Sequence, residues 1–230
     1  MLFRSPELLD WLAVEFVESG WSMKHMHRLI VTSQTYRLSS SNADADVATI
    51  AKDGDNRFLW RANPRRMEAQ LVRDSLLSLS GELDLTLGGP SIPVKEEASQ
   101  RRSLYYVHSH NEHQKFLSTF DDASVLECYR RAESIVPQQA LALENSPLAA
   151  NAAEKIAARI TAANDDDFIR AAFQTILCVD PVTSEITASR DALATWTAIA
   201  KTANRPNPTQ QARASLVQTL LNHNDFVTVR

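Results

Sequence analysis

Glycine is scarce in this chain and alanine is abundant, and this contrast limits the possible folds more than any other feature. Only five of the 230 residues are glycine, so few backbone positions are free to adopt a positive φ. Alanine is the strongest helix former. Apolar residues also recur with helical period, most completely between residues 169 and 177. The sequence therefore predicts a predominantly α fold, an irregular multi-helix bundle.

Capping residues, prolines and glycines set the bounds of the expected helices. A serine followed by a proline predicts a helix over residues 5–19, and Ser22 is expected to cap a second one. A third helix is expected to begin at Asn63 and Pro64 and to end near Gly81. Further helices are expected over residues 125–132, 137–144, 147–162, from 165–167 to Pro181, from Thr183 or Ser184 to 204–208, and over 209–221.

Three segments interrupt this helical pattern. Residues 39–56 are polar and acidic, which is typical of a surface loop and makes them a candidate hinge. Residues 85–100 hold two glycines and two prolines, so we expect a loop there and a possible sub-boundary within one domain. Residues 103–108 alternate aromatic and branched side chains, which predicts at most a short strand or hairpin.

Composition and charge exclude several classes of protein. The net charge of −4 and the pI near 5.9 provide no basic surface for a phosphate backbone, so nucleic acid is not expected as a partner. No apolar run reaches the roughly 20 residues that a membrane span needs. The first residues carry acidic groups where a signal peptide would be continuously apolar, so the chain as written has no export signal.

The two cysteines, Cys128 and Cys178, do not lie in a CxxC, CxxCH or Cys/His ligand spacing. Covalent haem attachment and a structural zinc cage within this chain are therefore excluded. A disulfide between the two cysteines and two small buried thiols are both compatible with the sequence.

The densest group of candidate ligands lies directly after the expected strand. If the strand continues, its period of two places His108 and His110 on one face, and Glu112 or His113 could complete a metal site. The alternative is a polar end of the strand whose imidazoles are solvated or hydrogen-bonded.

Four arginines are candidates for binding an anion. Arg66 and Arg73 lie seven residues apart on the expected helix, and Arg101 and Arg102 precede the expected strand. Guanidinium groups on one face could hold a carboxylate, sulfate or phosphate. The alternative is that the arginines join helices through ion pairs with neighbouring acids, for which the candidates are Glu68, Asp74, Asp121 and Asp122.

Two other acid patterns could support catalysis. Asp121, Asp122 and Glu127 are compatible with the paired carboxylates of a glycosidase. Adjacent acids before a helix are also common as caps and dipole partners. His223 and Asp225 form half of a triad, without an identifiable nucleophile. No GxSxG, HExxH, phosphate-loop or GxGxxG motif occurs.

Several segments together resemble one known family. They are SPELLDWLAVEFVESGW, NRFLWRANPRRMEAQLVRD with the later GGP loop, RRSLYYVH, FDDASVLECYRRAES and the closing LLNHNDFV. In order and content they resemble the PSD1 domain, a domain of unknown function from large planctomycete proteins. The resemblance covers nearly the whole chain, from Ser5 to Val229, and residues 1–230 are therefore expected to form the C-terminal part of such a domain.

What the resemblance implies is an architecture rather than an activity. The PSD1 domain usually lies behind a cytochrome-c-like domain in exported proteins associated with polysaccharide use, and it has no established catalytic residues. Haem is therefore expected only in a separate domain, and no cofactor is expected in this chain. By the resemblance the chain begins in the middle of a family member, so we expect a fragment.

Three hypotheses about function follow. In the first, the chain is a helical interaction or scaffold module that binds missing N-terminal segments or a protein partner, and apolar surface is exposed near residues 1–30. In the second, it is an enzyme domain acting on an acidic or sulfated glycan, and the four arginines converge in one pocket with a group from residues 108–122. In the third, it binds a metal at His108, His110 and His113. We favour the first.

Overall fold

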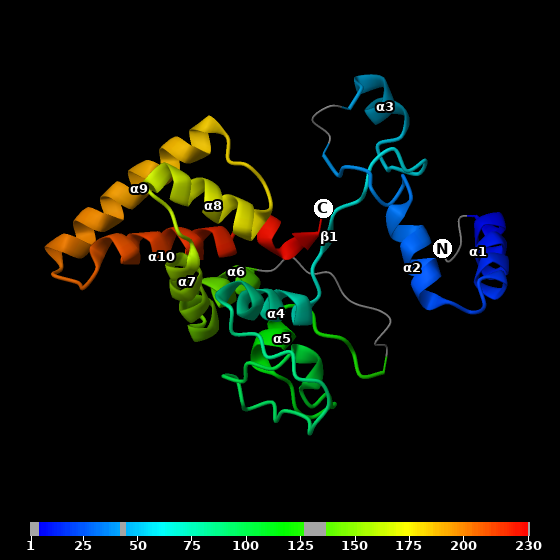
Figure 1. The fold of residues 1–230 in the computed structure, drawn as a ribbon, viewed down its shortest axis with the longest axis horizontal. Helices are drawn as coiled ribbons and strands as arrows, with labels where there is room; N and C mark the ends of the chain where they lie inside the picture. The colour runs from blue at the N-terminus through cyan, green and yellow to red at the C-terminus, as the bar shows by residue number, and fades with distance from the viewer. Residues whose placement is uncertain (1–4, 42–44, 127–136, 230) are drawn as a thin grey trace. The chain divides into compact units, whose positions relative to one another are not determined.

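The computed structural model describes residues 5–41, 45–126 and 137–229. These residues are predominantly helical (Figure 1), which confirms the predicted α fold class. The chain divides at Arg65 into unit 1, residues 1–65, and unit 2, residues 66–229. Residues 85–100, the possible sub-boundary, lie inside unit 2. Within the described ranges, no helix combines the length and the apolar character that crossing a membrane requires.

The described part of unit 1 contains α1 (Pro6–Glu18), α2 (Met23–Thr32) and α3 (Val47–Lys52). A proline in the first turn of α1 has its φ already set for a helix. The side chain of Ser22 accepts the N–H of His25 and caps α2. Helices α1 and α2 pack against each other. The bounds of α1 agree with the expected 5–19 to within one residue, and α2 begins directly after the expected cap Ser22.

Unit 1 buries very little apolar surface. Met26 is the single buried apolar side chain in its described residues, and the other buried side chains, Asp53 and Asn56, are polar. The Asp53 carboxylate accepts the N–H groups of Arg57 and Phe58 at 2.7 and 2.8 Å. Hydrogen bonds within a loop, more than an apolar core, therefore hold this part of unit 1 together.

The helices of unit 2 surround one apolar core. They are α4 (Ala69–Ser80), α5 (Lys115–Thr119), α6 (Pro137–Asn145), α7 (Pro147–Arg159), α8 (Asp165–Leu177), α9 (Thr183–Thr202) and α10 (Pro208–Leu221). Helix α10 packs against α7, α8 and α9, and α4 packs against α7 and α5 (Figure 1). Fully buried residues from four of these helices fill the core, among them Leu76, Ile156, Phe168 and Val217.

The expected start of the third helix was wrong by six residues. Helix α4 begins at Ala69, whereas Arg65–Arg66 form the short strand β1, which pairs with β2 (Thr228–Val229). The next residue, Met67, donates its N–H to the carbonyl of Val227 at 2.8 Å. Asn63 precedes Pro64, and a residue before proline favours extended backbone. The pairing of β1 and Met67 with the end of the chain continues this extended conformation and delays the start of α4. The helix ends at Gly81, as predicted.

The strand expected over residues 103–108 is absent. Ser103–Tyr105 form the 3₁₀ helix η1, and only an isolated bridge joins Tyr106 to Ile92. The cause of this difference is a contact with a residue distant in the sequence. The Ser103 N–H and hydroxyl both donate to Asp74 Oδ1, at 2.8 and 2.6 Å, which fixes the backbone in a turn despite its strand-like composition.

The remaining helices agree with the sequence pattern, with two qualifications. Helix α9 begins at Thr183, as expected, but Val182 in the N-cap position makes no side-chain cap hydrogen bond. The helix expected over 125–132 lies mostly outside the described residues, as do Glu127 and Cys128. Cys178 is exposed at the end of α8, so it is not the small buried thiol that the sequence allowed. A second 3₁₀ helix, η2 (Asn224–Val227), precedes β2.

Candidate functional site

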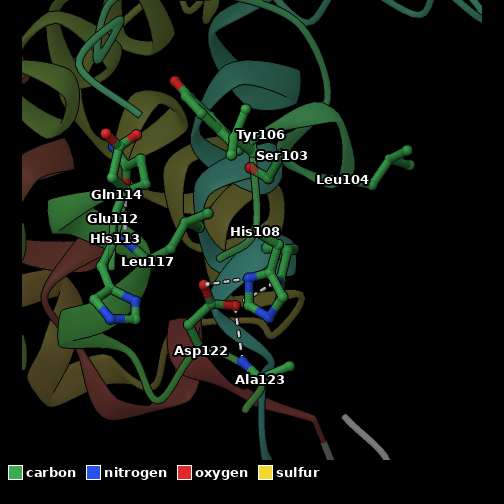
Figure 2. A pocket seen from close by; sticks show the side chains of 12 residues that line it. Ser103, Leu104, Tyr106, His108, Glu112, His113, Gln114, Leu117, Asp122 and Ala123 are labelled. Atoms are coloured by element: carbon green, nitrogen blue, oxygen red, sulfur yellow. Dashed lines mark hydrogen bonds and ion pairs between the residues drawn. The ribbon is translucent and has the colours of Figure 1, made fainter. Parts of the chain in front are cut away.

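Unit 2 contains a pocket of about 220 Å³ beside α4 and α5. Its wall is built by Gln70 of α4, by residues 103–104 and 106–108, by residues 112–114 before α5, and by the turn at Asp122. Among the side chains drawn in Figure 2, those of His108 and Asp122 point toward each other, whereas Leu104 points away from the rest. Residues 50 positions apart in the sequence thus meet here because the loop after η1 returns to the side of α4.

One wall of the pocket is a pair formed by His108 and Asp122. The His108 Nδ1 atom lies 3.7 Å from Asp122 Oδ2 (Figure 2). The other carboxylate oxygen accepts Gln70 Nε2 at 2.5 Å and the N–H of Ala123 at 2.8 Å. Asp122 is thereby fixed in position beside the imidazole, at a separation longer than a hydrogen bond.

The opposite wall is formed by Glu112, His113 and Gln114. Gln114 caps α5, because its side-chain oxygen accepts the N–H of Leu117 at 2.7 Å. Because the side-chain oxygen faces Leu117, the nitrogen Nε2 lies on the opposite side of the side-chain amide. The Gln114 side chain is buried and contributes to this wall.

The predicted metal ligands are only partly brought together. His108 and His113 line the pocket with Glu112, and His110 is not part of its wall. Among the described residues, no group of three or more His, Cys, Asp or Glu side chains is placed to hold a metal ion.

The four candidate arginines do not converge, and none of them lines the pocket. Arg66 donates to Asn224 Oδ1 at 2.7 Å and to Gln139 Oε1 at 2.5 Å. Arg101 donates to the carbonyls of Pro90 and Gly88. These guanidinium groups therefore hold loops and helices together, but through amide and backbone carbonyl oxygens and not through the ion pairs with acids that the structural alternative expected.

Arg73 is the most deeply buried of these arginines. Its guanidinium donates to the carbonyls of Ser99 and Arg101 and to the Ser103 hydroxyl. Burial lowers the pKa of the Arg73 guanidinium, partly offset by the nearby Tyr106 and Asp74. Asp74, one of the predicted partners, lies 3.9 Å from Arg73, and its other oxygen lies 3.8 Å from Arg102 Nε.

Sequence reasoning singled out His108 and Asp122 separately and missed Gln70 and Gln114. Gln114 had a detectable pattern, since it stands three residues before Leu117 as a side-chain cap does. Gln70 had none, because its partner Asp122 is 52 positions away.

The comparisons with known proteins give one positive result. The model of the PSD1 family, described as a protein of unknown function (DUF1553), matches residues 3–193. No curated protein and no solved structure matches the chain. The match covers most of the 230 residues and agrees with the resemblance carried by the sequence motifs. The chain therefore belongs to the PSD1 family.

Proposed function

We propose that this domain is a helical interaction module and that it binds a protein partner through the α1–α2 surface. This surface consists of the exposed apolar side chains between residues 8 and 31. They are Leu8, Leu9, Trp11, Val14, Val17, Trp21, Met23, Ile30 and Val31. Such a concentration of exposed apolar groups is typical of a surface that binds another protein.

The observation that carries the proposal is the contrast between the composition of α1 and its burial. Its apolar residues lie on almost every side of the helix, since each residue turns by about 100°. A helix that is apolar all round is normally buried. Yet none of the described residues of α1 is buried, and Leu8, Trp11 and Val14 are 54, 50 and 54% exposed.

The small core of unit 1 supports the same conclusion. A unit of about 60 residues normally buries more than half of the surface of its unfolded chain. With Met26 as the single buried apolar side chain in the described part of unit 1, a partner would provide the apolar contacts that the unit lacks.

The charges on α1 define the chemistry of the partner. Glu7, Asp10 and Glu18 are exposed around the apolar residues, whereas Glu15 is bound to His25 at 2.7 Å. The part of the partner that lies on α1 is therefore an apolar groove or helix edged by lysine or arginine, because acidic and basic rims are complementary. The exposed Lys24 and Arg28 of α2 would lie beside acidic groups of the same partner. A role within a larger assembly is consistent with this surface.

The test uses two amphipathic peptides with leucine on one face and either lysine or glutamate on the other. We expect the full chain to bind the leucine–lysine peptide in a calorimetric titration and to bind the leucine–glutamate peptide much more weakly. The double variant Leu9→Ser/Val14→Ser should bind the lysine peptide at least about tenfold more weakly. Leu87→Ser, on an exposed side chain of unit 2, is the matched control.

Three results would contradict the proposal. They are equal affinity for the two peptides, unchanged affinity of the double variant, and reversible self-association of the wild type that the double variant abolishes. The last result would identify a second copy, and not a basic partner, as the occupant of the surface.

A further inference from the structure

We propose that Trp21 is the anchor residue of the α1–α2 surface and inserts into an apolar slot of the partner whose edge carries a lysine or arginine. Trp21 lies in the turn between α1 and α2. It is 66% exposed, more than any other apolar side chain of this surface. Trp21 would contribute much of the affinity for the partner, so its role rests on the proposed function.

Trp21 has a backbone conformation that the end of α1 does not require. Helix α1 ends in a Schellman motif, in which Gly20 N–H donates to the Val17 carbonyl at 3.0 Å and Trp21 N–H donates to the Phe16 carbonyl at 2.9 Å. This motif needs one left-handed residue, and Gly20 provides it with a φ of +70°. Trp21 also has a positive φ, +61°, which is strained for a large side chain. Strained residues of this kind are concentrated at binding and catalytic sites.

A contact with Phe16 limits the orientation of the Trp21 side chain. The two ring centroids lie 5.2 Å apart and the ring planes are inclined by 73°. This edge-to-face arrangement uses at most one face of the indole, so the other face is free to meet a partner. A large aromatic side chain that is already oriented loses little conformational entropy on binding, which is typical of the residues that dominate an interface.

The indole determines the chemistry of the slot. Its ring requires an apolar lining, and its N–H requires a hydrogen-bond acceptor once a partner covers it. The free face of the ring attracts a cation. Glu18, an exposed acid, precedes Trp21 by three residues, and the exposed Lys24 follows it by three. The lysine or arginine of the partner is therefore expected on the α1 side of the ring, where it would interact with both the indole and the acids of α1.

Binding of the leucine–lysine peptide to the full chain tests the anchor. Trp21→Ala and Trp21→Gly should each weaken the binding by at least about tenfold in a calorimetric titration. Phe58→Ala is the matched control, because Phe58 is 86% exposed in the same unit and lies outside the surface; it should bind like the wild type. In the wild type, the peptide should shift the NMR signal of the Trp21 indole N–H. The signal of Trp60, whose indole N–H donates to the Asp53 carbonyl at 2.9 Å, should stay in place.

Hydrogen exchange of the α1 and α2 amides separates an anchor from a purely structural residue. Trp21→Ala keeps the left-handed strain and removes the contact with Phe16, so these amides should exchange several-fold faster than in the wild type. Glycine adopts a positive φ freely, so in Trp21→Gly the relief of strain offsets the lost contact and the exchange rates should stay within about threefold of the wild type. We expect the two variants to lose binding equally in spite of their different exchange rates, because the partner contacts the indole itself.

A third variant tests the cation at the edge of the slot. A leucine–glutamine peptide has the same apolar face as the leucine–lysine peptide and no charge. Trp21→Leu keeps an apolar side chain without an aromatic face. It should therefore lower the ratio of the affinities for the lysine and glutamine peptides by about two- to fivefold.

Three outcomes would overturn the role of Trp21. They are unchanged binding in Trp21→Ala and Trp21→Gly, a loss of binding in these variants that follows their exchange rates, and an unchanged affinity ratio in Trp21→Leu. If Leu9→Ser/Val14→Ser loses binding and the Trp21 variants keep it, the anchor is refuted and the proposed function stands. If the wild type does not bind the lysine peptide, the proposed function and the anchor are both refuted.

Discussion

The guanidinium carbon of Arg73 lies 5.0 Å from the centre of the Tyr106 ring, and both side chains are buried. The arginine comes from α4 and the tyrosine follows η1, so this contact joins the helical core to the loop that leads to the pocket. A guanidinium stacked on an aromatic face and bonded to carbonyls is well stabilised despite its burial. The pair therefore supports the floor of the candidate site.

Replacing Arg73 should destabilise unit 2 strongly. In Arg73→Met the carbonyls of Ser99 and Arg101 lose their donors. Unpaired buried groups of this kind are expensive, so we expect a loss of about 2–4 kcal/mol in the free energy of unfolding, measured with urea. Arg170→Met, on the exposed side of α8, should change the free energy by less than about 0.5 kcal/mol. Equal losses in the two variants would contradict the structural role of Arg73.

Stability at alkaline pH should depend on Tyr106. Burial raises the pKa of the Tyr106 hydroxyl above its usual value, although Arg73 opposes the shift. The folded protein therefore holds this proton more tightly than the unfolded chain does, and the corresponding stability is present in full below the unfolded pKa of about 10. It is lost as the pH rises from there through the folded pKa.

The measurement is the free energy of unfolding of the wild type and of Tyr106→Phe between neutral and strongly alkaline pH. At neutral pH the variant should lose about 1 kcal/mol, because the hydroxyl donates to the carbonyl of Glu96 at 2.8 Å. Above pH of about 10 the wild type should fall more steeply than the variant. Parallel curves over the whole range would show that Tyr106 does not titrate differently in the folded state.

Most of the helices could be predicted because each depends on residues close together in the sequence. Helices α1, α2 and α10 are each predicted by a capping residue or a proline at the start together with an apolar repeat. The errors share one cause, which is a partner far along the chain. Val227 draws Met67 into an extended segment before α4, and Asp74 holds Ser103 in a turn. Local pattern contains no information about such partners.

The candidate site was predictable in its residue types and not in its arrangement. His108 and Asp122 attracted attention as chemically capable groups, yet their pairing depends on the loop between them. The arginines were ambiguous, since the same guanidinium groups can bind an anion or backbone carbonyls. Their burial and internal acceptors distinguish the two alternatives, and burial is a property of the fold.

Gly81 should not tolerate a side chain. Its φ of +79° is disfavoured for other residues, and an added Cβ would lie 1.6 Å from Arg159 Nη1. Arg159 can move, so Gly81→Ala should cost about 1–2 kcal/mol in the free energy of unfolding. Gly88 has a similar φ of +76° and open space around it. The loss of unfolding free energy in Gly88→Ala therefore measures the cost of the backbone conformation alone. In an Arg159→Ala background the excess cost of Gly81→Ala should disappear; if it persists, the steric explanation is wrong.

Asn164, not one of the three following aspartates, should be the residue that stabilises the start of α8. Its side-chain oxygen accepts the N–H of Asp167 at 2.9 Å, which satisfies one of the free donors of the first turn. Asn164→Ala should therefore cost about 1 kcal/mol in urea unfolding, and Asn164→Ser should restore most of it. Asp165 instead contacts Arg213 at 2.8 Å on a half-exposed surface, so Asp165→Ala should cost less. A larger loss from Asp165→Ala than from Asn164→Ala would assign the capping role to the aspartates.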